Sequence, residues 1–365
     1  MFRASHTLAT LTLAASLGCS HSHSTATPSP APATIPTLGA AATVLASEVP
    51  IQRTARHDFK VTVVAAGLEN PWSMAFLPNG DMLVTERPGR LRIVRNGQLV
   101  ALPVQGVPRV RARGQGGLLD VAVHPNFATN RLVYLSYSKY GADTTEGATA
   151  VVRGRFENDQ LTNVEEIFEA KVLSRGNGHF GSRLAFDRNG YLFITLGDRQ
   201  VPPQGNLEAH PAQDLTTHHG KTIRLHDDGR IPADNPFIGR EGALPQIWSY
   251  GHRNMQGLAI HPTTGDVFTN EHGPQGGDEL NVEQAGRNYG WPVIGFGVNY
   301  TTGLAIHTGT TRQGMEQPVN VWVPSIGISG MMIYTGDKFP NGATTFSWAA
   351  WQARCSCGSR WMDVA

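Results

Sequence analysis

Polar residues able to move a proton or hold an anion gather on three glycine-rich segments of the chain. These segments are Gly178-His179-Phe180-Gly181-Ser182-Arg183-Leu184 with the later Leu196-Gly197-Asp198, Gly251-His252-Arg253-Asn254, and Glu271-His272-Gly273-Pro274. A neutral imidazole such as that of His179 suits proton transfer near neutral pH, because its ordinary pKa lies close to that pH. The guanidinium of Arg253 offers a rigid fork of N–H groups to an oxygen acceptor. Turn carbonyls such as those of Gly273-Pro274 are ligands that a hard cation such as calcium accepts.

Each of these features also has an ordinary structural interpretation. His179 could be a loop histidine that bonds to backbone, and Arg253 could form a salt bridge between neighbouring sheets. Most Gly-Pro sequences are merely turns, and Asp278-Glu279 could be a solvated acidic pair. The elements that carry these residues therefore decide whether the polar groups meet in one site.

The polar segments stand between apolar strand pairs that recur along the chain. These pairs cover residues 73–85, 119–135, 183–194 and 257–269, and their turns contain Pro, Asp, Asn-Gly or Thr-Gly. No segment shows a long amphipathic helical period. Repetition at intervals of roughly 45 to 75 residues predicts an all-β propeller with its site at one end of the central channel. A β-sandwich, the competing architecture, would show more evenly spaced strands.

The bulk composition limits the partners and the sources of stability. With 365 residues the chain is long enough for one large all-β domain or two ordinary ones. Charged residues make up 16% of the sequence and the formal net charge is +1, which argues against nucleic acid or an anionic membrane surface as the main partner. The only cysteines are Cys19, Cys355 and Cys357, so neither a disulfide framework nor a cysteine zinc site is expected.

Composition divides the chain into regions. Residues 1–19 resemble an export signal whose end, Ser16-Leu17-Gly18-Cys19, is similar to a bacterial lipoprotein cleavage site. An ordinary secretory signal with an incidental cysteine is the alternative. Residues 20–55 are rich in Ser, Thr, Ala and Pro and predict a flexible linker, whereas residues 56–340 hold the repeated strand pairs. We therefore expect a periplasmic or otherwise extracytoplasmic protein, with a lipid anchor at Cys19 if the first interpretation holds.

Residues 341–365 form an aberrant tail. Aromatic residues and cysteines crowd into this segment, and the strand alternation stops. Back-translation of residues 345–364 with G/C-rich codons and a one-base shift yields a pair of apolar strands with glycines between them. We hypothesise that the reading frame has shifted here and that the last blade is incomplete, with a divergent tail as the alternative. Resequencing the gene tests this, because an unbroken frame ending at Ala365 refutes it.

A set of ordered motifs resembles the soluble PQQ-dependent sugar dehydrogenases, and within them the aldose sugar dehydrogenase branch. The motifs are Gly114-Gln115-Gly116-Gly117-Leu118-Leu119-Asp120, Gly178-His179 through Leu196-Gly197-Asp198, Gly251-His252-Arg253-Asn254-Met255-Gln256-Gly257-Leu258-Ala259, Glu271-His272-Gly273-Pro274 and Asn288-Tyr289-Gly290-Trp291-Pro292. The resemblance runs from Phe59 to Pro340. It implies a six-bladed β-propeller with four-stranded antiparallel blades, PQQ as the hydride acceptor, and calcium that bridges cofactor and protein.

The resemblance also implies roles for the loop residues. His179 is then the base that takes the proton of a sugar's anomeric hydroxyl, and Asp198 holds the other ring nitrogen and supports the imidazolium. Arg253 lies beside the reactive carbonyl of PQQ, where it stabilises developing charge. Gln115 and Asn254 are neutral donors in the same cofactor pocket.

Further contacts to metal and cofactor are implied by the same resemblance. The backbone carbonyls of Gly273 and Pro274 hold the PQQ-linked calcium, and Glu279 and Tyr289 match positions that help to hold a second calcium in some relatives. Thr335 takes the cofactor-binding place that a lysine fills in glucose-oxidising relatives, so one charged contact is lost. The family's cationic contacts from the last blade would lie beyond residue 340, so we expect weakened PQQ binding.

The predicted function is oxidation of an aldose at its anomeric carbon to the lactone. The sequence has no Cys-x-x-Cys-His haem motif and no strand-flanked Gly-x-Gly-x-x-Gly, so the electrons are expected to pass to an external acceptor. Two alternatives stay open: a non-catalytic propeller that binds sugar or protein, and a calcium-dependent propeller lactonase.

Overall fold

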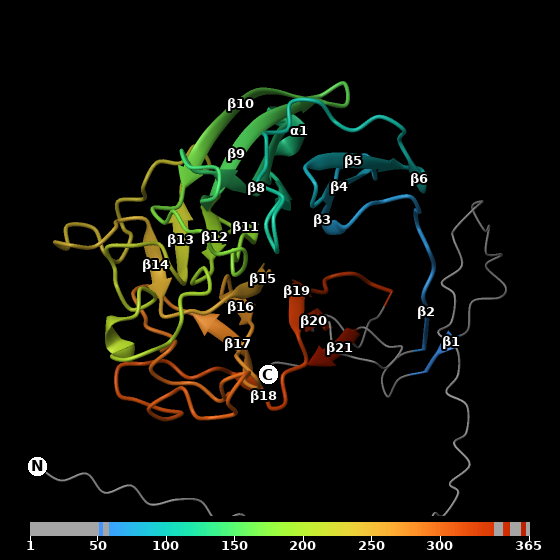
Figure 1. The fold of residues 1–365 in the computed structure, drawn as a ribbon. Coiled ribbons are helices and arrows are strands. Elements are labelled where there is room, and N and C mark those ends of the chain that lie inside the picture. Colours follow the sequence, from blue (N-terminus) through green and yellow to red (C-terminus); the bar gives the residue numbers. More distant parts are fainter. Residues whose placement is uncertain (1–50, 54–57, 339–345, 351–358, 363–365) are drawn as a thin grey trace, which may run out of the picture. The chain divides into compact units, whose positions relative to one another are not determined.

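Antiparallel sheets built from consecutive strands make up the structure, a computed structural model that describes residues 51–53, 58–338, 346–350 and 359–362 (Figure 1). Four sheets have four strands each, and a fifth has three. The first two sheets are β3 (Pro71–Phe76), β4 (Met82–Glu86), β5 (Arg90–Arg95) and β6 (Gln98–Leu99), then β7 (Leu118–Val123), β8 (Leu132–Tyr140), β9 (Gly147–Glu157) and β10 (Gln160–Glu169). The next two are β11 (Leu184–Phe186), β12 (Leu192–Leu196), β13 (Lys221–Leu225) and β14 (Ile247–Tyr250), then β15 (Met255–Ile260), β16 (Val267–Glu271), β17 (Asp278–Glu283) and β18 (Asn320–Trp322). The three-stranded sheet is β19 (Ile328–Ile333), β20 (Phe346–Ala350) and β21 (Ser359–Met362).

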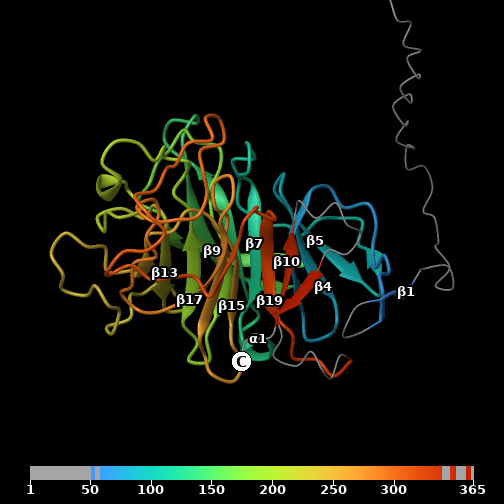
Figure 2. The same cartoon turned by 90° about the horizontal axis from the view of Figure 1, so that it is seen from below.

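The first strand of each sheet lies nearest the centre. β3 packs against β7, β7 against β11, β11 against β15, and β15 against β19. Figures 1 and 2 show the later strands of each sheet running outward from these inner strands. Sheets arranged radially in this way form a β-propeller. The predicted all-β propeller with four-stranded antiparallel blades is therefore confirmed.

The apolar strand pairs predicted from the sequence are the inner two strands of the four-stranded sheets. Ala75 pairs with Leu83 between β3 and β4, and Ala185 pairs with Phe193 between β11 and β12. The turns of these two hairpins contain Gly80 at φ 88° and Gly190 at φ 82°, in the left-handed region that glycine adopts without steric cost. The Asn-Gly sequences thus fix the tight turns that set strand register.

Apolar side chains fill the space between successive sheets. One cluster joins the first sheet to the second, through residues such as Leu83, Ile93, Leu118 and Leu135, and each of these is fully buried. Similar clusters join the second sheet to the third and the third to the fourth. This continuous packing holds the inner strands, and hence the loops at their ends, in fixed positions.

Two short helices and a separate two-stranded sheet complete the elements of the described residues. The α-helix α1 (Phe127–Asn130) connects β7 to β8, and the 3₁₀-helix η1 (Leu207–Ala209) lies in the long connection from β12 to β13. Strands β1 (Ile51–Gln52) and β2 (Phe59–Lys60) pair with each other. Within the described ranges, no helix combines the length and apolar character that crossing a lipid bilayer requires.

The structure describes part of the C-terminal tail but almost none of the N-terminal region. The predicted signal segment 1–19 and nearly all of the linker 20–55 lie outside the described residues. In the tail, where strand alternation was expected to stop, β20 pairs with β19 and β21 pairs with β20. Backbone pairing with the neighbouring strand thus forms strands at residues 346–350 and 359–362, although the sequence pattern does not alternate there.

Candidate active site

Loops from several sheets enclose a cavity of about 630 Å³. Its volume lies within the roughly 300–1,000 Å³ typical of small-molecule sites. The lining includes Gln115, His179, Arg253 and Asn254, which are sequence-predicted site residues, together with Trp72, Arg87, Gln200, Gln256, Tyr300 and Ser325. Residues from segments far apart in the sequence therefore meet at one cavity.

His179 and Asp198 form a hydrogen-bonded pair at the wall of the cavity. Nδ1 of His179 lies 2.6 Å from Oδ1 of Asp198, and both residues are buried. A carboxylate accepts, so the ring carries its proton on Nδ1 and leaves Nε2 as the nitrogen with a free lone pair. This is the arrangement that a histidine base needs, with its tautomer and orientation fixed by an acid.

The electrostatic surroundings of this pair favour a neutral imidazole and an ionised carboxylate. Burial lowers the pKa of His179 below its ordinary value, and the cations Arg253 and Arg199 act in the same direction against the opposing effect of Asp198. Burial alone would raise the pKa of Asp198, but His179, Arg253 and the backbone N–H of Gln200 outweigh it and hold that pKa below its usual range. At neutral pH, His179 is therefore ready to accept a proton.

The loop that carries His179 has an unusual backbone conformation. His179 has φ 50° and Ser182 has φ 84°, a region that non-glycine residues rarely adopt. Gly197, on the segment that leads to Asp198, approaches the same loop so closely that a Cβ there would lie 2.3 Å from the His179 carbonyl oxygen. The glycines of the motif thus allow the contact between the two loops.

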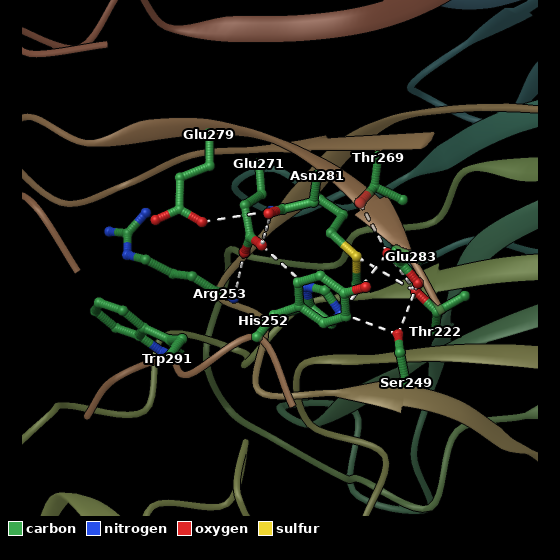
Figure 3. A network of polar contacts seen from close by, with 12 residues as sticks. Thr222, Ser249, His252, Arg253, Thr269, Glu271, Glu279, Asn281, Glu283 and Trp291 are labelled. Carbon is green, nitrogen blue, oxygen red and sulfur yellow. Dashed lines mark hydrogen bonds and ion pairs between the residues drawn. The ribbon is translucent and has the colours of Figure 1, made fainter. Parts of the chain in front are cut away.

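Arg253 lies directly before β15 and is oriented by the neighbouring turn. Its backbone N–H donates to Oε2 of Glu271 at 2.6 Å, and Nη1 donates to the carbonyl of His272 at 3.0 Å. The guanidinium carbon lies 5.3 Å from the ring centre of Trp291, within cation–π range. Figure 3 shows these two side chains next to each other. Nε and Nη2 of Arg253 have no hydrogen-bond partner in the described part of the chain and remain for a ligand.

Gln115 and Asn254 each use one end of the side-chain amide to support the His179 loop. Oε1 of Gln115 accepts the backbone N–H of His179 at 2.8 Å, and Oδ1 of Asn254 accepts that of Gly181 at 3.2 Å. Their NH₂ groups make no hydrogen bond to other described residues, and both side chains line the cavity. Each residue can therefore support the loop and donate to a bound acceptor at the same time.

The Gly273-Pro274 turn connects β16 to β17 and keeps its carbonyls out of the strand ladder. The carbonyl of Gly273 accepts the Tyr300 hydroxyl, and that of Pro274 accepts the Ser325 hydroxyl, each at a long 3.4 Å. Such weak contacts leave lone pairs for a cation. Among the residues that the structure describes, no group of three or more His, Cys, Asp or Glu side chains is arranged to hold a metal.

Asp278 is a structural residue rather than part of a solvated acidic pair. It is fully buried, and Oδ2 accepts the backbone N–H groups of Ile326, Gly327 and Ile328 at 2.7–3.1 Å. Oδ1 accepts the N–H of Gly273 at 3.0 Å. Asp278 therefore ties the Gly273-Pro274 turn to the next sheet.

Glu279 and Tyr289 line a second, small cavity together with Arg253 and Glu271. Burial raises the pKa of Glu279 well above its ordinary value, and the nearby negative charge of Glu271 adds to this effect. The hydroxyl of Tyr289 donates to the carbonyl of Val282 at 2.6 Å and accepts the N–H of Gln284 at 2.9 Å. The hydroxyl of Tyr289 is thus already bonded to backbone groups.

Thr335 does not join the other predicted site residues. It follows the end of β19 at Ile333, is exposed, and is not among the residues that line the large cavity. The role of Thr335 in cofactor binding therefore stays a prediction.

A buried network behind Arg253 was missed by sequence reasoning. Nδ1 of His252 lies 2.9 Å from Oε1 of Glu271, and its Nε2 lies 3.0 Å from Oγ of Ser249 and 3.6 Å from Oε1 of Glu283 (Figure 3). The ring stacks on Tyr289 at a centroid distance of 4.7 Å. The signal was available, since His252 stands directly before Arg253 in its motif, but nothing in the sequence shows which carboxylates face it.

Two further residues that contact the His179–Asp198 pair were also missed. Nε1 of Trp291 donates to Oδ2 of Asp198 at 2.8 Å. Arg199, the residue after Asp198, donates to the carbonyls of Gly176 and Gly178. Trp291 belongs to a quoted motif, but its distance from Asp198 along the chain hides the contact.

The fold and this cavity define a β-propeller with a buried histidine–aspartate pair at a small-molecule cavity. The profile of the Glucose / Sorbosone dehydrogenase family matches residues 68–355, and the chain belongs to this family. It is 48% identical over 286 residues to Aldose sugar dehydrogenase YliI of Escherichia coli, covering 77% of this chain and 74% of that protein. It is 30% identical over 280 residues to Quinoprotein glucose dehydrogenase B of Acinetobacter calcoaceticus, covering 71% and 57%.

Solved structures give the same assignment. The apo form of soluble aldose sugar dehydrogenase from Escherichia coli is similar with a TM-score of 0.75 and 44% identity, covering 80% of this chain and 83% of that one. The PQQ-bound form of aldose sugar dehydrogenase from Streptomyces coelicolor is similar with a TM-score of 0.64 and 27% identity, covering 83% and 84%. The resemblance inferred from the sequence is therefore confirmed at the level of the family.

Proposed function

We propose that this protein is a PQQ-dependent dehydrogenase that oxidises an aldose at its anomeric carbon to the lactone. The observation that carries the proposal is the His179–Asp198 pair at the wall of a cavity that Arg253 also lines. Family membership and the PQQ-bound relative support the choice of cofactor. The electrons would leave to an external acceptor.

The residues of the cavity fit the proposed cofactor. PQQ is a planar quinone with three carboxylates, and the unpaired N–H groups of Arg253, Gln115 and Asn254 are donors for such oxygens. The carbonyls of Gly273 and Pro274, held only by long hydroxyl contacts, would bind the linked calcium. When bound, PQQ supplies the acceptor for the hydride that leaves the sugar.

The chain's own residues would handle the proton. Nε2 of His179 accepts the proton of the anomeric hydroxyl as the C–H bond of that carbon breaks, so that the carbon becomes the lactone carbonyl. Asp198 stabilises the imidazolium through the bond at Nδ1. The cationic fork of Arg253 stabilises negative charge on the oxygens it binds.

A second calcium at Glu279 and Tyr289 is part of the proposal. Glu271 and Asp278 place negative charge beside Glu279, and a divalent cation would favour the ionised form of that carboxyl. The carbonyl of Tyr289 would be its second ligand, because the hydroxyl is already bonded.

We further propose the complete architecture and location of the protein. The propeller would have six blades within residues 56–340 and the tail 341–365, with the last blade shortened by the frameshift. Residues 1–19 would direct export, with lipidation at Cys19, and residues 20–55 would tether the propeller to the membrane surface.

Reconstitution tests the proposed function directly. Purified protein is treated with a chelator, loaded with PQQ and calcium, and assayed by dye reduction over a panel of aldoses. We expect reduced-PQQ absorbance on adding sugar and dye reduction that requires both PQQ and calcium. Binding of sugar without reduced-PQQ absorbance would favour the non-catalytic propeller, and lactone hydrolysis without PQQ would favour the lactonase.

A further inference from the structure

Arg199 is a buried cation without a carboxylate partner. Only 4% of the residue is exposed, and it forms no ion pair with the described residues. The neighbouring Asp198 has both oxygens taken, by His179, Trp291 and the backbone N–H of Gln200. Burying an uncompensated charge is costly, so a residue of this kind calls for a functional explanation.

Its surroundings add to the cost of burial. Burial, together with the positive charge of Arg111, lowers the pKa of Arg199 to about 9. The guanidinium therefore still carries its charge at neutral pH. Nε of Arg199 has no hydrogen-bond partner among the described residues, so the guanidinium is satisfied through its two terminal nitrogens alone.

Those two nitrogens bind the loop that carries His179. Nη1 donates to the carbonyl of Gly178, and Nη2 donates to that of Gly176 at 2.7 Å. The backbone N–H of Arg199 donates to the carbonyl of His179 at 3.3 Å. The guanidinium carbon also lies 3.5 Å from the ring centre of Phe180. One side chain thus contacts the backbone or ring on both sides of the imidazole.

The loop needs such support up to Gly181, because only from Ser182 onward do backbone bonds to Thr195 continue the pairing with β12. Residues 175–183 lie before β11, and His179 and Ser182 have positive φ values. Conformations of this kind persist only where the surroundings enforce them. A planar guanidinium can bridge two carbonyls in fixed geometry, whereas the single ammonium of a lysine cannot reproduce the fork.

We propose that Arg199 is a positioning residue that clamps residues 176–180 and thereby fixes the direction of the His179 ring. The inference depends on the proposed function only for the role of His179 as a base, because the clamp itself can be measured without turnover. The charged and titratable groups that face His179 are Asp198, Arg253 and His272, together with Arg199. A change in the loop therefore alters the environment of the imidazole as well as its direction.

The test compares Arg199→Lys and Arg199→Met with the control Arg188→Lys. Arg188 also bridges two carbonyls, those of Thr263 and Thr264 at 2.7 and 2.9 Å, on an exposed loop. Hydrogen exchange in the apo-protein reports on the clamp through the amides of His179 and Gly181, which bond to Gln115 and Asn254. We expect exchange at these amides to become about tenfold faster or more in both Arg199 variants and to stay unchanged in the control.

Turnover provides the second measurement. In protein loaded with PQQ and calcium, we expect Arg199→Lys to lower kcat by about tenfold or more with little change in KM, because substrate contacts are kept while the base is misdirected. Arg188→Lys should keep the wild-type kcat. If Arg199→Met does not fold, Arg199→Lys still gives both readouts.

The outcomes separate the clamp from the proposed function. Unchanged amide exchange in Arg199→Lys overturns the clamp whatever the activity. Wild-type exchange together with wild-type kcat in Arg199→Lys would mean that a positive charge is enough to hold the loop. That result also overturns the clamp. Faster exchange in Arg199→Lys with a wild-type protein that reduces no dye would support the clamp while refuting the dehydrogenase.

Discussion

Trp291 donates its indole N–H to the carboxylate oxygen of Asp198 that His179 does not use, at 2.8 Å. Its ring also lies 5.3 Å from the guanidinium carbon of Arg253. One aromatic residue therefore contacts both the partner of the proposed base and the proposed anion-binding cation. The backbone of Trp291 is held as well, by Gly251 at its N–H and by Gln213 at its carbonyl. The pair and the cation are thus parts of one connected arrangement.

Trp291→Phe should weaken both stability and turnover. The substitution keeps an aromatic ring but leaves a buried oxygen of Asp198 without its donor, which costs about 1–3 kcal/mol in the free energy of unfolding. Without this donor the ionised form of Asp198 is less stabilised. Its hydrogen bond then orients the imidazole of His179 less firmly, and kcat falls by about tenfold. Denaturant unfolding and dye reduction measure the two effects.

Trp248→Phe is the matched control for that variant. The indole N–H of Trp248 is buried without a hydrogen-bond partner among the described residues, so its loss removes no bond. The ring loses a similar area in both variants. Equal losses of stability in the two proteins would contradict the importance of the Trp291–Asp198 bond.

His179→Ala should abolish most turnover while keeping the cofactor. Removing a positioned base costs about 10²- to 10⁴-fold in kcat. The proposed PQQ donors Gln115, Asn254 and Arg253 remain, so the absorbance spectrum of the loaded protein should match that of the wild type. His261→Ala, at the remote end of β15, serves as the control. Normal turnover in His179→Ala would show that the base has been wrongly assigned.

Gly197→Ala should push His179 and Asp198 apart. A Cβ at Gly197 would lie 2.3 Å from the His179 carbonyl oxygen, so the backbone has to shift. We expect the melting temperature to fall. We also expect kcat to fall by about tenfold or more, because small misplacements at a reacting centre are costly. Gly309→Ala, where the nearest atom lies 3.8 Å away, should leave both unchanged. Similar behaviour of the two variants would refute the argument.

The sequence predicted best those features that depend on a few neighbouring residues, namely the hairpin turns and the loop motifs. Asn-Gly turns between alternating apolar runs predicted the inner hairpins, because these signals act over a few residues. The glycine-rich motifs predicted that His179, Asp198 and Arg253 lie on loops. In the structure His179 and Arg253 line one cavity, and Asp198 bonds to His179 behind it. The tail was less predictable, since β20 forms by pairing with β19 and β21 by pairing with β20, rather than by their own sequence pattern.

The residues that support the site could not be read from the sequence. Trp291 contacts Asp198 across 93 positions, and Arg199 looks like an ordinary surface arginine until its burial is known. Such contacts depend on how separate sheets pack, and local propensity does not report on that packing. Thr335 shows the converse, because matching one motif position did not bring the residue to the cavity.

Stability should depend on pH with opposite slopes on either side of neutrality. Burial alone would lower the pKa of His252, but Glu283 and Glu271 outweigh it and raise that pKa above the unfolded value of about 6.5. Its stabilising contribution is therefore fully present below pH 6.5 and is lost as the pH rises through the folded pKa. Burial lowers the pKa of His218 to about 3 and that of His219 to about 4. These two bind a proton more readily when unfolded, so they reduce stability as the pH falls below 6.5.

His252→Gln isolates the slope on the alkaline side. Because the variant has no imidazole between Glu271 and Glu283, its free energy of unfolding should change less between pH 6.5 and 9 than that of the wild type, even if its absolute stability is lower. Denaturant unfolding of the apo-protein at a series of pH values measures both curves. Parallel curves above pH 6.5 would mean that His252 is not held as an imidazolium, and that the carboxylates behind Arg253 are neutralised in another way.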